Sequence, residues 1–361
     1  MNKKALLFKI ILICEFCLLF TAIAIFSPSA NYSDTERRAL KKMPKTSTEN
    51  IFSGKFMSDF DDYTLDQFPA RDIFRKVKAN FSKYVFFNKD NHGLYLKDGH
   101  LSKLEYPLNK DKVNKNLAQI NGIYKKYLSE TNCDCYLSII PDKNYFLKPE
   151  LQLDYDEFIL NIKENLSFAR YIDVSKTLSL ESFYFTDQHW KQDCILETAE
   201  VLAKGMNQII SNNFVLKTLE NPFYGAYYGQ ALLNVKPDTI NYYDFPGFEE
   251  SCTVTSYNTG KGVPSSVYDM KKAFGKDPYE MFLSGADALI TIENSAAKSE
   301  KELIVFRDSF GSSLIPLLIP NYSKITLVDL RYMQVGMLPN FVEFDDQDVL
   351  FLYSTLVMNG V

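Results

Sequence analysis

The sequence predicts an α/β fold, in which a mostly parallel β-sheet is covered by helices on both faces. Short apolar runs alternate with segments of helical periodicity through much of the chain, a pattern typical of parallel sheets whose strands are buried on both sides. Polar clusters directly follow three of these runs, as expected where strands end at a ligand-binding edge. With 361 residues, the chain can form one large domain with an accessory segment, or two domains.

The composition argues against nucleic-acid and zinc binding. The formal net charge is -5 and the basic residues are interspersed with acidic ones, so we expect no nucleic-acid partner. Three histidines and the absence of a Cys-x-x-Cys pair beyond the N-terminal apolar segment predict neither a metal site nor a cofactor. Free thiols are expected at Cys133, Cys135, Cys194 and Cys252, although a bridge from Cys194 or Cys252 to one of the other two stays open.

The N-terminus carries an apolar run from Ala5 to Phe26, interrupted only by Lys9 and Glu15. The run is long for a signal peptide and long enough to cross a bilayer, so we favour an uncleaved single-pass anchor with its basic end inside. Cleavage after the small residues Ser27 or Ser29 is the alternative. In either case, the remainder of the chain lies outside the cytoplasmic membrane.

The domain organisation follows from this anchor. We expect the anchor over residues 1–27, a polar and charged stalk over 28–50, and one α/β domain over 51–361. Within the domain, residues 211–282 are rich in Tyr, Gly and Pro without clear periodicity, which predicts an irregular insertion over one end of the sheet.

The expected elements take their order from periodicity and turn signals. Helices are predicted at 51–87 with an interruption at Pro69, and at 116–128, 156–165, 191–210 and 312–319. Strands are predicted at 135–140, 171–174, 288–292, 303–306, 325–328 and 349–353. Asp98-Gly99 predicts a small hairpin that carries His92 and His100, two histidines expected to be structural or exposed.

Three polar clusters follow the predicted strands. They are Asp142-Lys143, Arg307-Asp308-Ser309 and Asp329-Leu330-Arg331. In an open parallel sheet, ligands bind beyond the carboxyl ends of the strands, so these clusters should meet at one edge although they are far apart in the sequence. Ser309 would lie in a strand-to-helix turn, where backbone N–H groups can stabilise an oxyanion. A serine in such a turn is also a common helix cap.

His189 is the third histidine and has an acidic residue, Asp187, two positions before it. Residues two apart in an extended turn project to the same side. Asp187 can therefore accept a hydrogen bond from one imidazole nitrogen and leave the other nitrogen to take a proton from Ser309, which is the logic of acyl-transfer catalysis. The alternative is that Asp187 caps the following helix and His189 is a packed core residue.

These two segments carry a resemblance to a known family. Asp187-Gln188-His189-Trp190 and Arg307-Asp308-Ser309-Phe310-Gly311 together resemble the DHHW proteins, which group with SGNH-hydrolase-like proteins that O-acetylate alginate and other exported polysaccharides. Further segments resemble family blocks, namely Asp66–Asp72, Leu96–Gly99, Pro141–Lys143 and Asp329–Tyr332. The resemblance implies a flavodoxin-like SGNH fold with a permuted motif order, in which Ser309 is the nucleophile, His189 the base and Asp187 its orienter.

The sequence departs from the family pattern at two points. Gln188 replaces the first His of the name-giving motif, and the SGNH oxyanion Gly and the Gly-x-Asn-Asp block are not evident. Oxyanion donors are therefore sought in the N–H groups of Ser309 and Gly311, with Arg331 as a charged helper. Lys143 and Tyr332 either orient a glycan or pair with acidic neighbours.

The resemblance implies an extracytoplasmic enzyme that passes acetyl from an acyl-serine to a cell-surface or exported polysaccharide. Free coenzyme A is not expected outside the cell, so a multi-spanning membrane acyltransferase is implied as the donor partner. Two alternatives stay open. A carbohydrate O-acetyl esterase would use the same triad with water as the acceptor, and a non-catalytic glycan-binding or assembly protein would keep only the fold.

Overall fold

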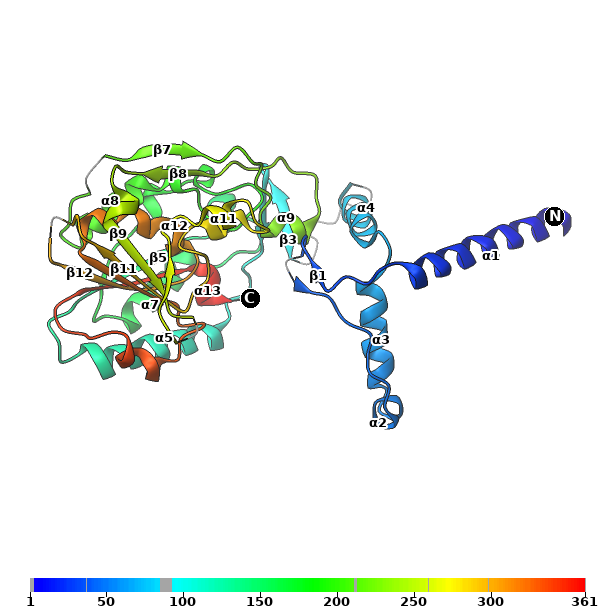
Figure 1. Ribbon diagram of the computed structural model, residues 1–361, viewed down its shortest axis with the longest axis horizontal. Helices are drawn as coiled ribbons and strands as arrows, with labels where there is room; N and C mark the ends of the chain where they lie inside the picture. Colours follow the sequence, from blue (N-terminus) through cyan, green and yellow to red (C-terminus); the bar gives the residue numbers. More distant parts are fainter. Residues whose placement is uncertain are drawn as a thin grey trace. The chain divides into compact units, whose positions relative to one another are not determined.

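The computed structural model describes residues 3–36, 38–84, 93–210, 213–258, 260–297 and 299–360. The chain forms two compact units. The N-terminal unit comprises residues 1–91 with 229–234, and the α/β unit comprises 92–228 with 235–361. Figure 1 shows the central sheet of the α/β unit and the helices that pack on its two faces. His92 and residues 85–87 of the predicted first helical segment lie outside the described residues.

The N-terminal unit is mainly helical. Its elements are α1 (Lys3–Phe26), β1 (Tyr32–Ser33), β2 (Arg38–Ala39), α2 (Thr48–Phe52), α3 (Lys55–Asp66) and α4 (Arg71–Tyr84). Within α1, Leu6–Ile23 is long and apolar enough to cross a membrane and is not buried. By length and composition this helix is a candidate membrane span, and a signal sequence would pass the same test.

Ion pairs join the predicted stalk to the helices of the N-terminal unit. Arg38 donates two hydrogen bonds to Asp66, at 2.8 and 2.5 Å, and Glu36 pairs with Arg71 at 2.5 Å and with Arg75 at 3.2 Å. The hydrogen bond from Arg38 lowers the pKa of Asp66 to about 2. The predicted domain start at residue 51 therefore differs from the structure, because these contacts place α3 and α4 in one unit with the stalk.

An eight-stranded sheet organises the α/β unit, in the order β10-β9-β11-β13-β12-β14-β5-β6. Its strands are β5 (Asp134–Ile140), β6 (Arg170–Tyr171), β9 (Cys252–Ser256), β10 (Val263–Ser265), β11 (Leu289–Asn294), β12 (Glu302–Arg307), β13 (Lys324–Val328) and β14 (Asp348–Ser354). The five strands from β13 to β6 are parallel. Five of the six predicted strands are present, and the sixth, predicted at 171–174, is reduced to the two residues of β6. The prediction of a mostly parallel sheet is confirmed.

Two features of the sheet differ from the prediction. β11 runs antiparallel to β13, with Leu289 opposite Val328, because apolar periodicity does not encode strand direction. β9 and β10 come from the predicted insertion and extend the same sheet. Val254 is the only buried residue of β9, so this strand lacks the apolar run by which buried strands are recognised.

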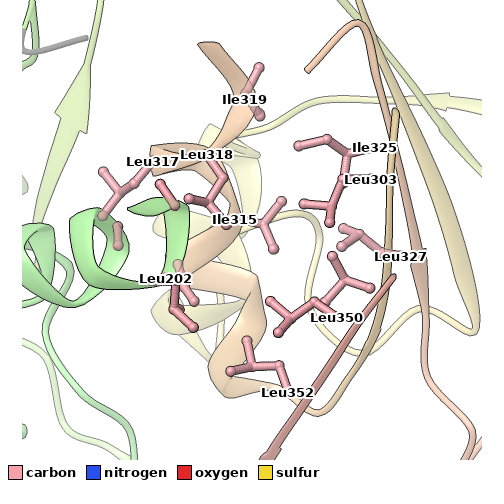
Figure 2. Close-up of a cluster of buried hydrophobic side chains, with 14 of the residues drawn as sticks. Leu202, Leu303, Ile315, Leu317, Leu318, Ile319, Ile325, Leu327, Leu350 and Leu352 are labelled. Carbon is pink, nitrogen blue, oxygen red and sulfur yellow. The ribbon is translucent and has the colours of Figure 1, made fainter. Parts of the chain in front are cut away.

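The two faces of the sheet carry separate hydrophobic cores, since alternate residues of each strand point to opposite sides. Leu303 and Val305 of β12 pack in one core with the helices α8 (Leu196–Gly205) and α12 (Phe310–Leu314). Figure 2 shows this core, where Leu202 and Ile315 face Leu350 and Leu327. Ile304 and Phe306 point to the other core, beneath α5 (Lys110–Ile123) and α7 (Tyr155–Asn165).

The predicted helix 116–128 begins earlier than expected, at Lys110, whereas the predicted helices 191–210 and 312–319 are interrupted. A π-helical turn, η1 (Tyr124–Leu128), continues α5. The predicted helix 191–210 is a 3-10 turn, η4 (Gln192–Cys194), followed by α8. The segment 312–319 leaves α-helical geometry after Leu314, because prolines occupy the first turns of the 3-10 segments η6 (Ile315–Leu317) and η7 (Ile319–Asn321).

Short elements surround the sheet. The predicted hairpin is β3 (Leu94–Lys97) and β4 (His100–Lys103), and the former insertion also holds β7 (Val215–Thr218), α9 (Ala226–Ala231), β8 (Asn241–Asp244), α10 (Phe248–Ser251), α11 (Met270–Ala273) and η5 (Pro278–Met281). Helices α6 (Lys143–Leu147) and α13 (Thr355–Asn359) follow strands β5 and β14 directly. His100 is fully buried against the ring of Phe185, which agrees with a structural histidine.

Candidate active site

The carboxyl ends of β5, β12, β13 and β14 lie at one edge of the sheet, because these four strands are parallel neighbours. This arrangement brings the three predicted polar clusters to the same edge. Ser309 follows the end of β12 and stands at the N-cap position of α12. Its side chain makes no capping hydrogen bond to that helix, so the hydroxyl is not used as the cap that the sequence left as an alternative.

The structure joins Ser309, His189 and Asp187 in one hydrogen-bonded series. His189 Nε2 lies 2.8 Å from Ser309 Oγ, and His189 Nδ1 lies 2.5 Å from Asp187 Oδ1. Asp187 is 1% exposed and His189 7% exposed, whereas Ser309 is only partly buried. The hydroxyl is thus the accessible end of the series, and the carboxylate is its buried end. Gln188 is not a member of the series, and its side-chain nitrogen lies 3.5 Å from His189 Nε2.

Backbone groups fix the orientation of Asp187. Its Oδ1 also accepts a hydrogen bond from the His189 N–H at 3.0 Å, and its Oδ2 accepts one from the Ala226 N–H at 2.7 Å. A Cβ atom on Gly225 would lie 2.2 Å from the Asp187 Cβ, so the chain can pass this close only as glycine. Residues 225 and 226 belong to the predicted insertion, which therefore contributes directly to the site.

A second buried carboxylate, Asp238, holds the turn that precedes Asp187. It accepts hydrogen bonds from the Phe185 N–H at 2.7 Å, the Thr186 N–H at 2.8 Å and the Thr186 hydroxyl at 2.5 Å. The Thr186 oxygen in turn accepts the Gly225 N–H at 2.9 Å. Burial raises the pKa of Asp238. Sequence reasoning missed this residue, because its partners lie about fifty positions away and no motif marks it.

Tyr279 positions the imidazole. Its ring stacks on His189 with centroids 3.9 Å apart and planes 8° apart, and it is 4% exposed. Its hydroxyl donates to the Ser309 carbonyl oxygen at 3.2 Å and lies 2.9 Å from Ser313 Oγ. Trp190 donates from Nε1 to the same Ser313 oxygen at 2.9 Å. These contacts restrict the rotation of His189 and tie it to the start of α12.

The end of β14 adds a fourth polar cluster that the sequence analysis did not identify. Asp308 accepts hydrogen bonds from the Ser354 N–H at 2.7 Å, the Ser354 hydroxyl at 2.6 Å and the Phe310 N–H at 2.9 Å. Asp142 accepts the Thr355 hydroxyl at 2.6 Å and the Tyr155 hydroxyl at 2.9 Å. Burial raises the pKa of Asp142. Asp308 and Asp142 thus join the ends of β12 and β5 to the end of β14.

The predicted accessory residues fall into different environments. The Gly311 N–H donates to the Asp308 carbonyl oxygen at 3.1 Å, so of the two predicted oxyanion donors the Ser309 N–H is the stronger candidate. Arg331 forms a bidentate pair with Asp329, at 2.9 and 2.6 Å, and Tyr332 is exposed. In the described part of the chain, no hydrogen bond joins Arg331 or Tyr332 to Ser309 or His189.

Lys143 is buried rather than presented at the surface. Its Nζ donates to the Leu101 carbonyl oxygen at 2.7 Å and lies 5.6 Å from the centroid of the Tyr227 ring. Burial lowers its pKa to about 7, although the charges of Asp187 and Asp238 oppose the shift. Because the side chain is buried, Lys143 is not exposed at the surface where a glycan could contact it.

Across the described residues, no group of three or more His, Cys, Asp and Glu side chains is arranged to hold a metal ion. All six cysteines are free thiols, so neither of the bridges left open by the sequence is formed.

The mostly parallel sheet, its helices on both faces and the Asp187-His189-Ser309 series at its carboxyl edge define an SGNH-hydrolase-like α/β protein. The family model described as DHHW protein matches residues 161–328, which include all three members of the series. This match confirms the resemblance to the DHHW family.

Solved structures show the same fold. A DHHW family protein from Eubacterium siraeum DSM 15702 is 20% identical with a TM-score of 0.60, covering 75% of this chain and 94% of that one. PatB1 from Bacillus cereus is 18% identical with a TM-score of 0.61, covering 75% of this chain and 98% of that one. PatB1 with a sulfonyl adduct gives 19% identity and a TM-score of 0.60, with 74% and 96% covered. No curated protein sequence matches the chain.

Proposed function

We propose that this chain is an extracytoplasmic O-acetyltransferase that modifies a cell-surface or exported polysaccharide through an acyl-Ser309 intermediate. The observation that carries the proposal is the hydrogen-bonded series from Asp187 through His189 to a partly exposed Ser309 hydroxyl. A carboxylate on Nδ1 fixes the tautomer in which Nε2 is free to accept the serine proton. This arrangement supports serine catalysis more directly than any single motif does.

In the first half-reaction, Ser309 Oγ attacks the carbonyl carbon of the acetyl donor while His189 Nε2 takes the hydroxyl proton. The carbonyl electrons move to oxygen, and the Ser309 N–H is the proposed donor to this oxyanion. When the tetrahedral intermediate collapses, the bond to the donor's leaving atom breaks. His189 returns the proton to that atom, and the acetyl ester remains on Ser309.

In the second half-reaction, His189 removes the proton from a sugar hydroxyl, and the hydroxyl oxygen attacks the acetyl ester. Ser309 Oγ leaves and recovers its proton from His189, so the enzyme is restored. Water in place of the sugar would give an esterase, because the two reactions share every step except the identity of the acceptor. The resemblance to the polysaccharide-acetylating proteins favours transfer.

The proposed location follows from α1. We propose that this helix anchors the chain in the cytoplasmic membrane with the α/β unit outside, where a polysaccharide acceptor is available and free coenzyme A is not. A multi-spanning membrane acyltransferase is the proposed source of acetyl groups. Such a partner would carry acetyl groups across the membrane to Ser309.

Covalent labelling tests the nucleophile. A sulfonyl adduct is described for PatB1, and sulfonyl fluorides and fluorophosphonates react with activated serine hydroxyls. We expect the full-length protein to gain one adduct on the peptide that contains Ser309, and to release nitrophenol from nitrophenyl acetate. Ser309→Ala should abolish both, whereas Ser266→Ala, which changes an exposed serine, should change neither.

Two outcomes would contradict the proposal. Full esterase activity in Ser309→Ala would show that another group is the nucleophile. A correctly folded native protein that neither labels nor turns over the ester would favour a non-catalytic glycan-binding protein. Acetyl analysis of the surface polysaccharide from a deletion strain then separates transferase from esterase, since loss of the transferase lowers the acetyl content and loss of an esterase raises it.

A further inference from the structure

Helix α4 of the N-terminal unit turns its apolar side chains to the outside. These side chains recur at spacings of three and four residues and therefore lie on one face of the helix. They are Ile73, Phe74, Val77, Phe81 and Tyr84, with exposed fractions of 65%, 48%, 59%, 52% and 56%. We call this surface the α4 apolar face. Clustered exposed apolar side chains of this kind mark a surface that meets another apolar medium.

The opposite side of α4 packs through small and polar groups. Ala79 is 3% exposed and Arg75 pairs with Glu36. Asn80, seven residues after Ile73, lies at the edge of the apolar face and donates to the Leu232 carbonyl oxygen at 3.1 Å. A helix on the surface of a soluble domain does the reverse, because it buries its apolar stripe and exposes its polar residues. The polarity of α4 is thus inverted with respect to its own unit.

Basic residues flank the α4 apolar face. Lys76 and Lys78 are exposed and Lys83 is partly buried, while Asp72 is the only acidic residue in the helix. Asp72 accepts a hydrogen bond from Thr35 at 2.8 Å on the packed side. An apolar helix face flanked by lysines fits the boundary between acyl chains and anionic headgroups.

Helix α1 is the reason to expect a bilayer close to α4. The same unit contains α1, the helix that is long and apolar enough to cross a membrane. A chain anchored through α1 keeps α4 at the membrane surface, where a weak interfacial helix gains from its high local concentration.

We propose that α4 lies in the interface of an anionic phospholipid bilayer, with the α4 apolar face in the acyl-chain region and Lys76, Lys78 and Lys83 at the headgroups. The proposal concerns the N-terminal unit and does not depend on the chemistry at Ser309. It gives the N-terminal unit a role of its own, which is to contact the membrane through α4 as well as through α1.

Tryptophan fluorescence in the full-length protein tests the proposal. The chain has one tryptophan, Trp190, which is buried and gives a constant background. Val77→Trp is the reporter on the α4 apolar face, and Leu160→Trp, on the exposed side of α7 in the other unit, is the matched control. Each variant is placed in nanodiscs of brominated phosphatidylcholine, either alone or with about one quarter phosphatidylglycerol.

We expect the emission of the Val77→Trp reporter to shift to shorter wavelength and to be largely quenched by the brominated chains, more strongly when phosphatidylglycerol is present. The control should show neither change. Adding Lys76→Glu and Lys78→Glu should remove the dependence on phosphatidylglycerol. Ile73→Trp provides a second reporter if Val77→Trp folds poorly.

Three results would overturn the proposal. Long-wavelength emission without quenching would show that the α4 apolar face is exposed to water. Short-wavelength emission without quenching would mean that a partner protein or a second copy of the chain covers the face. Equal quenching with and without phosphatidylglycerol, unchanged by the two charge reversals, would refute the anionic headgroup contact.

Discussion

Two buried carboxylates beside the candidate site and two carboxylates of the N-terminal unit are held in opposite ways. In the α/β unit, Asp142 and Asp238 are buried and accept hydrogen bonds mainly from neutral donors, and burial raises the pKa of each. In the N-terminal unit, Asp66 and Glu36 lie beside arginines. The hydrogen bond from Arg38 lowers the pKa of Asp66, and for Glu36 the arginines outweigh the opposing effect of burial. Asp142 and Asp238 are therefore fixed acceptors, whereas Asp66 and Glu36 are ion-pair partners; Asp329, which pairs with Arg331, is a carboxylate of the α/β unit held in the second way.

The two kinds of contact serve different purposes: one fixes the geometry of a site, and the other joins segments of the chain. Neutral donors on strand ends and turns hold a carboxylate in one geometry, which suits a site whose distances matter. Half-exposed ion pairs join segments at little net cost or gain, because solvent screens them and the side chains lose freedom on pairing. We therefore expect changes in the α/β unit to have large, geometry-dependent effects and changes in the N-terminal unit to have small, pH-dependent ones.

The largest effect is expected for Asp187→Asn. The amide keeps the size of the side chain but cannot hold His189 in the tautomer with a free Nε2, and an orienting carboxylate is worth about ten-thousandfold in kcat in serine hydrolases. Turnover of nitrophenyl acetate by the full-length protein measures the loss. Glu181→Gln, an exposed acidic side chain six residues earlier, is the matched control. A loss of less than tenfold would remove Asp187 from the proposed triad.

Asp238→Asn should damage the same site from a distance. Its oxygens accept two backbone N–H groups and the Thr186 hydroxyl, and an amide nitrogen would face at least one of these donors. We expect the free energy of unfolding to fall by about 2 kcal/mol and the esterase rate to fall with it. Urea unfolding and turnover measure the two effects. Unchanged stability together with full activity would show that the turn before Asp187 is held by its other contacts.

Two variants of Tyr279 distinguish its two contacts with the triad, which are the ring stacked on His189 and the hydroxyl bonded to the Ser309 carbonyl oxygen. Tyr279→Phe keeps the ring on His189 and loses the hydroxyl, whereas Tyr279→Leu loses both. A ring face beside the imidazolium that forms during attack is worth about 1 kcal/mol, so Tyr279→Leu should lower kcat about fivefold while KM changes little. Tyr279→Phe should recover most of the rate. Equal losses in the two variants would assign the effect to the hydroxyl instead.

The sequence was sufficient to predict the candidate triad residues, but not the residues that hold them in position. Ser309 and His189 are recognisable because one follows an apolar run and the other follows an acidic residue at a fixed spacing. The parallel strands then bring both to one edge. Asp238, Tyr279 and Gly225 lie in a segment without periodicity, and their roles arise only from tertiary contacts, which no local pattern encodes. The inverted polarity of α4 was hidden for the same reason, because a helical wheel gives a face but not the side that is packed.

The smallest effect is expected for Arg38→Gln in the N-terminal unit. The Arg38 side chain is 40% exposed, so its pair with Asp66 should contribute less than about 1 kcal/mol at neutral pH. The pKa of Asp66 is lowered to about 2. The contribution is therefore present above the ordinary Asp pKa and is lost as the pH falls through about 2.

Hydrogen–deuterium exchange of the α3 amides in the full-length chain measures this contribution without unfolding the other unit. Arg38→Gln should speed exchange slightly at neutral pH, and the difference from the native chain should disappear as the pH falls below about 2, where Asp66 becomes protonated in both proteins. Lys41→Gln, which removes a pair with Asp62 that is exposed on both sides, should have no effect at either pH. If the difference between Arg38→Gln and the native chain persisted at low pH, the arginine would act through packing and the contrast between the two units would fail.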